Sequence, residues 1–239
     1  TAIAGVLLKL DGVEILLDGV CREVKPYPAT PPEERQLLVG SWPDVVAFTH
    51  GHKDHFDPVY AAQFRMQTNG VLLGPEGLTG VQASTEPVCV KDVTITPIPS
   101  RHIGIAGKTT PHVSYIIEGS SCVWFLGDAS PSQWQSKHDL PKPDVLLAPY
   151  AYATTEAAWK ATKALGANKV ILLHLPSRED DVAGLWDAIE STVETSEIAG
   201  IPSVTRFTIS IWIGRRTTGI PMSIPKNIVT TSPMLQERR

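Results

Sequence analysis

Cysteine is scarce in this 239-residue chain, which has only Cys21, Cys89 and Cys122, far apart from one another. An odd number of distant thiols provides neither a CxxC motif nor a disulfide framework. Each cysteine is therefore expected to be a small buried apolar residue. This usage predicts a reducing compartment, and hence a cytoplasmic protein.

Long hydrophobic runs are also missing, because the longest apolar stretches, such as residues 145–148, contain only a few residues. A helix that spans a bilayer needs about 20 apolar residues, so we expect no membrane contact. No charged and apolar leader opens the chain, and no signal peptide is expected. Since the first residue is Thr1 rather than Met, we expect that a short N-terminal piece is missing.

Clustered positive charge is the third absence. The chain has 21 basic and 25 acidic residues, a net charge of −4, and adjacent basic residues only at 215–216 and 238–239. A nucleic-acid or anionic-membrane surface is normally marked by grouped lysines and arginines. The charge pattern therefore predicts a small-molecule substrate and no nucleic-acid partner, and it leaves the oligomeric state open.

Hydrophobic residues make up 42% of the chain, enough for a sizeable core. A hairpin is expected around Asp11-Gly12, followed by a proline-rich loop at residues 21–34. We expect further strands at residues 45–49, 88–98, 112–118, 122–126, 145–148, 169–173 and 204–213, and helices capped at Asp57, Thr154 and Ser177 that end near residues 67, 165 and 198. Strands dominate early and alternate with helices later, which predicts a single domain over residues 1–239 with helices flanking its sheets.

Three of the seven histidines fall within six residues, interleaved with an acid: His50, His52, Asp54 and His55. His50 and His52 are two apart, so on an extended chain they point the same way and can hold one ion. Asp54 and His55 follow at a turn that can redirect them to a second ion. Imidazole with a carboxylate suits zinc, iron or manganese, and a bound metal offsets the cost of crowding four donors.

Two other interpretations of this cluster exist. A polar surface turn could hold three histidines by chance, but that density of donors directly after the apolar stretch at residues 45–49 is improbable. A site for a single metal ion is the more serious alternative.

The HxHxDH pattern at residues 50–55, after an apolar strand, resembles the signature of the metallo-β-lactamase superfamily of hydrolases. The resemblance implies an α/β fold, a four-layer αββα sandwich with metals at one edge. It also implies three downstream ligands in the order histidine, aspartate, histidine. His102, Asp128 and His174 occur in that order, each close to the end of an expected strand.

The resemblance implies seven ligands for two divalent metal ions. These are His50, His52 and His102 for one ion, Asp54, His55 and His174 for the other, and Asp128 as the bridge. Zinc is the expected metal, with manganese or iron as alternatives. Asp54 and Asp128 are the implied catalytic residues, and Asp54 is expected to take part in proton transfer as well.

Each downstream ligand has an ordinary structural alternative. His102 competes with His112, which is less apt because it opens a strand. Asp128 could cap a following segment, and His174 could lie at a sheet edge without a metal. Three donors near strand ends in the expected order nevertheless favour the metal site. His138 lies in a polar stretch and is expected to be exposed.

Two adjacent metals acidify a bridging water and provide hydroxide at neutral pH. No Gly-x-Ser-x-Gly elbow and no Walker-type loop offers another mechanism. We therefore expect hydrolysis of a small ester, lactone or phosphodiester by a metal-bridged hydroxide. The chain resembles the short, single-domain branch that includes ascorbate-6-phosphate lactonase-like proteins. The flavo-di-iron branch has glutamate at the place of His52, so histidine there favours hydrolysis.

Candidate substrate-binding residues are those beside predicted ligands or at strand ends, namely Arg101, Tyr150 and Arg178. An arginine there would suit a carboxylate or phosphate group, although loop arginines are also common without a ligand. The proline-rich segment at residues 21–34 is expected either to rim the site or to be a plain surface connection.

Three further functions compete with hydrolysis of a small molecule. A nuclease or RNA-processing enzyme would use the same site, but the acidic balance and the lack of a ribonuclease Z-like arm disfavour it. A mono-iron oxidoreductase of the same fold would carry one catalytic iron. A metal-stabilised module would have no catalysis at all.

Overall fold

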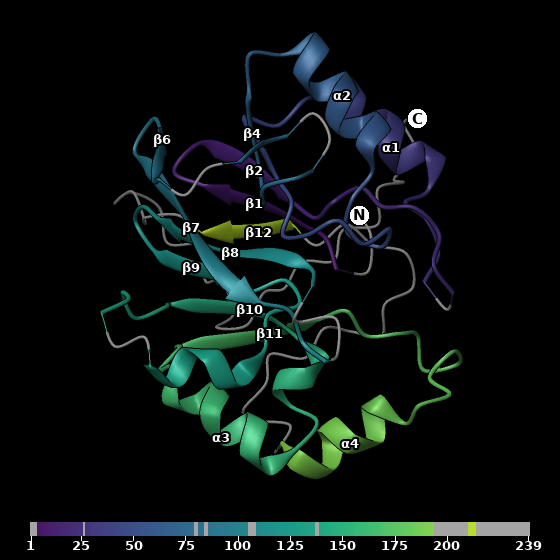
Figure 1. Cartoon of the computed structure of the whole chain (residues 1–239), viewed down its shortest axis with the longest axis vertical. Helices are drawn as coiled ribbons and strands as arrows, with labels where there is room; N and C mark the ends of the chain where they lie inside the picture. The colour runs from purple at the N-terminus through teal and green to yellow at the C-terminus, as the bar shows by residue number, and fades with distance from the viewer. Residues whose placement is uncertain are drawn as a thin grey trace, which may run out of the picture.

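The computed structural model describes residues 4–25, 27–78, 81–83, 86–104, 109–136, 139–193 and 210–213. Within these ranges the strands form two six-stranded sheets. Helices α1 and α2 lie beyond one sheet, and α3 and α4 lie beyond the other (Figure 1). The expected αββα order of layers is thereby confirmed.

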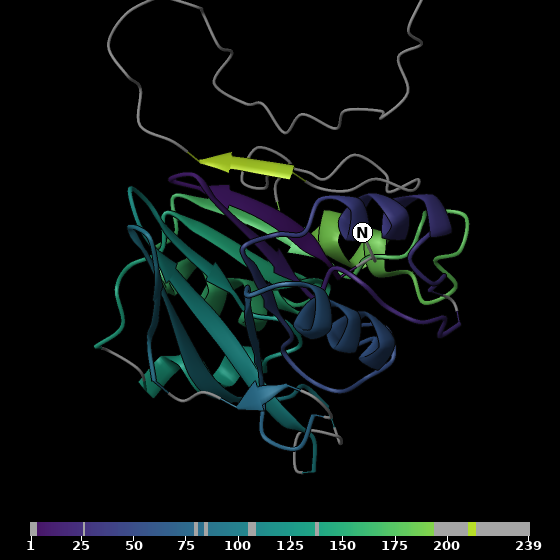
Figure 2. The ribbon, with the colours of Figure 1, turned by 90° about the horizontal axis from the view of Figure 1, so that it is seen from above.

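The first sheet has the strand order β12-β1-β2-β3-β4-β5. Its strands are β1 Val6–Leu10, β2 Val13–Leu17, β3 Val45–Ala47, β4 Val71–Gly74, β5 Gln82–Ala83 and β12 Ser210–Ile213. The expected hairpin joins β1 to β2, and its turn residues Asp11 and Gly12 have φ values of 48° and 76°. Such left-handed pairs match the twist of a two-residue hairpin. Strand β12, from the other end of the chain, pairs in parallel with β1 (Figure 2).

The second sheet has the order β11-β10-β9-β8-β7-β6. Its strands are β6 Val88–Val90, β7 Val93–Arg101, β8 Pro111–Glu118, β9 Cys122–Phe125, β10 Val145–Pro149 and β11 Lys169–Leu173. The single strand expected at residues 88–98 is instead the hairpin β6–β7, because the chain reverses at Lys91, whose φ is 52°. Strands β9, β10 and β11 run parallel, so their carboxyl ends meet at one edge.

Alternating side chains divide the apolar residues among three cores. In β3, Val45 and Ala47 point between the two sheets, whereas Val46 points toward α1 Pro32–Gly40 and α2 Pro58–Gln67. Trp124 of β9 points the other way, toward α3 Glu156–Ala164 and α4 Leu185–Thr192. A period of two lets each sheet bury both faces. None of the described helices is long and apolar enough to cross a membrane.

Several expected boundaries were wrong. Helix α1 begins at Pro32, inside the segment expected to be a loop, since proline is well suited to the first turn of a helix. Thr155 rather than Thr154 caps α3. The helix expected from Ser177 begins only at Leu185, because the Asp181 carboxylate accepts the N–H groups of residues 185 and 186. Strands β4 and β5 were not expected. Residues 194–209, where that helix and the last strand were also expected, lie outside the described ranges.

Candidate metal centre

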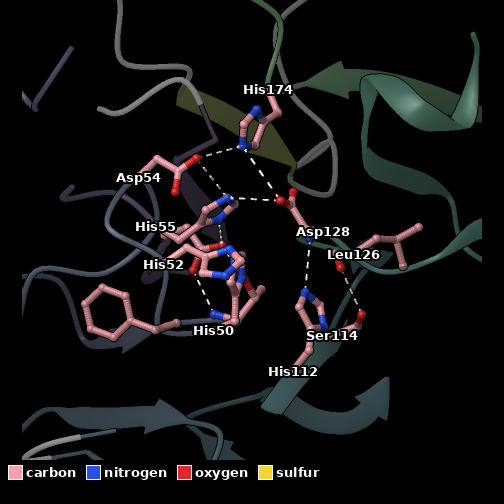
Figure 3. A network of polar contacts seen from close by, with 12 residues as sticks. His50, His52, Asp54, His55, His112, Ser114, Leu126, Asp128 and His174 are labelled. Atoms are coloured by element: carbon pink, nitrogen blue, oxygen red, sulfur yellow. Dashed lines mark hydrogen bonds and ion pairs between the residues drawn. The ribbon is translucent and has the colours of Figure 1, made fainter. Parts of the chain in front are cut away.

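Strand β3 leads directly into the histidine-rich segment. After the buried residues Phe48 and Thr49, the chain turns, and the N–H groups of His55 and Phe56 both donate to the carbonyl oxygen of His52, at 3.1 and 2.9 Å. Helix α2 then begins, with the Asp57 carboxylate accepting the N–H groups of its first turn. This turn brings the donors of residues 50–55 together on one side of the site, facing Asp128 and His174 (Figure 3).

One group of donors consists of His50, His52 and His102, whose nitrogens lie within 4.8 Å of one another. His50 Nε2 is 3.0 Å from His52 Nδ1. The Nδ1–H of His102 donates to the carbonyl oxygen of Ile103 at 2.7 Å, which leaves Nε2 with its lone pair toward the site. These three residues are those expected to share one ion.

A second group consists of Asp54, His55 and His174. His174 Nε2 lies 3.2 Å from Asp54 Oδ2, and His55 Nε2 lies 4.0 Å from the same oxygen. His174 directly follows strand β11 and has a φ of 63°, a value that a residue other than glycine seldom adopts. Strain of this kind is concentrated at functional sites, where the surrounding structure enforces it.

Asp128 lies between the two groups. Its Oδ2 atom is 3.5 Å from His55 Nε2, 3.5 Å from His102 Nε2 and 3.8 Å from His174 Nε2. The preceding Gly127 has a φ of 52°, and a Cβ there would lie 2.5 Å from Thr49 Cγ2. Glycine therefore allows the chain to pass close to Thr49. The Asp128 carboxylate that follows faces His55 and His174 (Figure 3).

The donor set fits metal ions. The Nε2 atoms of His55, His102 and His174 are buried and have no hydrogen-bond partner among the described residues. An unpaired buried polar atom costs about 1–3 kcal/mol, which three neighbouring atoms would not all bear without compensation. Burial lowers the pKa of His50 and His52, which favours the neutral imidazole that a metal requires.

The charges of the buried side chains also favour a bound cation. Burial opposes charge on His55, but the carboxylates of Asp128 and Asp18 outweigh it and hold the pKa of His55 well above its usual value. Burial likewise acts against ionised Asp128, whose pKa the nearby His55 nevertheless holds well below the ordinary value. A positive charge thus belongs between these carboxylates, and a bound cation would take the place of the proton.

Sequence reasoning missed Asp18, which is fully buried behind the site. Its carboxylate accepts hydrogen bonds from the Thr49 N–H at 2.8 Å, the Thr49 hydroxyl at 2.6 Å and His55 Nδ1 at 2.8 Å. The Thr49 hydroxyl in turn accepts from His50 Nδ1 at 2.9 Å. Asp18 therefore turns the Nε2 atoms of His50 and His55 toward the centre. Its position directly after β2, like that of His174 after β11, was the available signal.

His112, considered above as a rival to His102, has a different place. It is buried, its Nε2 accepts the backbone N–H of Asp128 at 3.0 Å, and its Nδ1 lies 2.7 Å from the Ser100 hydroxyl. Burial lowers the pKa of His112 to about 3, so the ring is neutral. His112 supports the backbone of Asp128 from below (Figure 3). His138 lies outside the described residues.

The predicted substrate-binding residues have different surroundings. Tyr150 lies beside His174, with ring centroids 6.0 Å apart. The Arg101 guanidinium donates to the hydroxyls of Ser130 and Ser132 at 3.3 and 2.9 Å. Arg178 pairs with Glu190 and stacks 4.7 Å above the ring of Trp186. All three assignments remain predictions.

Another tyrosine that sequence reasoning did not single out reaches the site. The proline-rich segment places Tyr27 against His174, with ring centroids 4.8 Å apart and planes at 85°. Burial of the side chain raises the pKa of Tyr27 most, and the nearby Tyr150 and Asp54 raise it further. The Tyr27 hydroxyl is therefore protonated at neutral pH. The proline-rich segment therefore rims the centre, one of the two roles considered for it.

Comparison with known proteins identifies the family of the chain. The family model described as "Beta-lactamase superfamily domain" matches residues 2–174. A search of the curated proteins finds no match.

Solved structures with the same fold share little sequence. A possible metal-dependent hydrolase from Veillonella parvula superposes with a TM-score of 0.61 at 17% identity, covering 84% of this chain and 94% of that one. Igni18, a metallo hydrolase from the archaeon Ignicoccus hospitalis, gives 0.53 at 22% identity, covering 77% and 85%. CmlA, a diiron β-hydroxylase from Streptomyces venezuelae, gives 0.51 at 15% identity, covering 80% of this chain and 46% of that one. At these identities the likeness shows a shared fold.

Proposed function

The chain belongs to the beta-lactamase superfamily, and from that premise we propose that it is a metal-dependent hydrolase of a small ester, lactone or phosphodiester. The observation that carries the proposal is the position of Asp128, whose Oδ2 faces three imidazole nitrogens that come from different segments and have no hydrogen-bond partner among the described residues. One carboxylate oxygen surrounded in this way suits a bridge between two cations.

The proposed centre would hold two divalent ions, with zinc expected and manganese or iron as alternatives. The proposed ligands are His50, His52 and His102 for one ion, Asp54, His55 and His174 for the other, and Asp128 for both. When bound, such ions acidify water at neutral pH and polarise the substrate oxygen under attack.

The chain's own groups would position the reactants and move protons. The Asp54 side chain is 16% exposed, so it can contact both the other proposed ligands and an incoming substrate. Burial acts to raise the pKa of Asp54, but His174 and His55 outweigh it and keep that pKa below the usual value. Ionised Asp54 can therefore accept the proton of the attacking water at a carboxylate oxygen and pass it to the leaving group.

Elemental analysis of the purified protein, combined with a hydrolysis screen, tests the proposal. Near two metals per chain and turnover of an ester, a lactone or bis(4-nitrophenyl) phosphate are expected. His52→Ala should lose metal and activity, whereas His138→Ala, a histidine outside the proposed ligand set, should lose neither. Full metal content and full activity in His52→Ala would reject the site. One iron per chain with no hydrolysis would favour the oxidoreductase alternative.

A further inference from the structure

Two tyrosines meet the same metal-ligand candidate from different parts of the chain. Tyr27 lies in the segment between β2 and α1, and Tyr150 opens the short helix after β10. Both rings lie edge to face with His174, at centroid distances of 4.8 and 6.0 Å. Both are half-buried, and among the described residues neither hydroxyl has a hydrogen-bond partner. We call them the tyrosine pair.

The segment that carries Tyr27 is hydrogen-bonded to the turn at residues 50–56, which carries the first proposed metal ligands and is called the metal-binding turn below. The N–H of Arg22 donates to the carbonyl oxygen of Lys53 at 2.7 Å, and its Nε donates to that of Phe56 at 3.4 Å. Val24 and Tyr27 then pair as an antiparallel bridge. Tyr27 is therefore held in place beside the centre, which reduces the entropy lost when a ligand contacts it.

The cations expected to bind substrate have other partners. Arg178 is paired with Glu190 over Trp186, and Arg101 is bonded to two serine hydroxyls. Besides the ligand candidate His55, whose ring lies 5.1 Å from that of His174, the described side chains around His174 are two phenols and the carboxylates of Asp54 and Asp128. A phosphodiester carries a negative charge that a guanidinium recognises best, whereas a carbonyl oxygen needs only a neutral donor.

We propose that the tyrosine pair forms the substrate-binding wall of the centre and selects an uncharged acyl substrate, an ester or lactone, over a phosphodiester. The two rings pack against the apolar part of the substrate. The hydroxyl of Tyr27 donates a hydrogen bond to a substrate oxygen, which makes Tyr27 a positioning residue. This assignment rests on the proposed hydrolase function and narrows its substrate class.

The test uses the protein with its own metal, and metal content is measured in every variant. Tyr27→Phe and Tyr150→Phe remove one hydroxyl each. Tyr60→Phe is the matched control, because its hydroxyl makes a 3.5 Å contact with the Leu38 carbonyl, in the layer of α1 and α2. The probes are 4-nitrophenyl acetate, bis(4-nitrophenyl) phosphate and 4-nitroacetanilide, an amide with the shape of the ester. Binding of the amide is followed by equilibrium dialysis and needs no turnover.

Loss of one hydrogen bond from Tyr27→Phe should weaken 4-nitroacetanilide binding about 3- to 10-fold and raise KM for the ester by a similar factor. Tyr150→Phe keeps the ring that packs against the substrate and should change both quantities by less than Tyr27→Phe does. Metal content, hydrolysis of the phosphodiester and all properties of Tyr60→Phe should be unchanged.

Three outcomes would contradict the proposal that the tyrosine pair binds the substrate. The first is that amide binding and KM for the ester are unchanged in both variants. The second is that hydrolysis of the phosphodiester falls as much as hydrolysis of the ester. The third is that the wild-type protein does not bind the amide. A preference for the phosphodiester that is lost in Lys53→Ala, an exposed lysine of the metal-binding turn, would also reject it. If the wild type hydrolyses none of the probes but binds the amide, and Tyr27→Phe weakens that binding, the hydrolase proposal fails while the substrate-binding role of the tyrosine pair is supported.

Discussion

Asp18→Asn is the most informative single substitution, because the amide keeps the shape of the carboxylate and changes only its hydrogen bonding. The amide oxygen of the variant can still accept the N–H of Thr49. Its NH₂ group, however, would face the Thr49 hydroxyl and His55 Nδ1, which both donate to Asp18 in the wild type, at 2.6 and 2.8 Å. To avoid two facing donors, His55 must move its proton from Nδ1 to Nε2, and a protonated Nε2 cannot bind a metal.

The expected size of this effect follows from the position of Asp18 behind a proposed ligand. Outer partners of metal-binding histidines are worth about 10- to 100-fold in metal affinity. That range corresponds to about 1.4–2.7 kcal/mol. The ion held by Asp54, His55 and His174 should therefore dissociate first, while the group of His50, His52 and His102 is affected only through Thr49.

Chelator competition on the metal-loaded protein measures this loss, with elemental analysis giving the number of ions retained. Asp144→Asn is a matched control, since Asp144 also accepts a backbone N–H, that of Cys122 at 2.8 Å, and belongs to no proposed ligand group. Hydrolysis should fall with metal occupancy in Asp18→Asn and should recover at high metal concentration. Equal chelator resistance in Asp18→Asn and the wild type would refute the role of Asp18.

Three further outcomes are expected. Gly127→Ala should lower the free energy of unfolding by about 2–4 kcal/mol in urea titrations, because its Cβ would meet Thr49 and its φ is 52°. His112→Ala should cost about 1–3 kcal/mol by the same assay, since it leaves the buried N–H of Asp128 unpaired. Burial acts to raise the pKa of Asp57, but Arg35 and the N–H groups of α2 outweigh it and hold that pKa low. Ionised Asp57 thus adds to the free energy of unfolding at neutral pH, and this contribution is lost as the pH falls through the pKa that Asp57 has in the folded protein. The difference in free energy of unfolding between wild type and Asp57→Asn should therefore shrink in acid.

Two outcomes would contradict these expectations. A Gly127→Ala protein as stable as the wild type would mean that the close approach to Thr49 is not required. A stability difference for Asp57→Asn that grows below about pH 4, the ordinary carboxyl pKa, would contradict the sign assigned to Asp57.

The donors of the candidate centre were predictable because each lies near the end of an apolar strand or of a strand pattern. Alternation and turn residues identify such ends locally, as with Asp11-Gly12 and with residues 169–173 before His174. The spacing of the histidines at residues 50–55 then favours a shared metal ion, since two histidines two apart share a direction. The strand ends and the first cluster of donors therefore followed from short-range patterns, whereas the αββα fold, the downstream ligands and hydrolysis were expectations that rested on the resemblance to a known family.

Elements without a strong local pattern were not predictable. The hairpin turn at Lys91 contains no glycine or proline, so β6 and β7 were expected as one strand. Helix α4 begins where the Asp181 side chain folds forward onto residues 185 and 186, and the Ser177 pattern pointed to a start several residues too early.

Only the tertiary structure decided which residues support the donors. Asp18 and His55 are 37 residues apart, and Tyr27 and His174 come from segments in different halves of the chain. The same holds for His112, which a sequence reading treats as a competing ligand and the fold places under the backbone of Asp128. A sequence specifies strand ends one at a time by local periodicity. Which ends meet depends on the pairing and packing of two sheets, a property of contacts distant in the sequence.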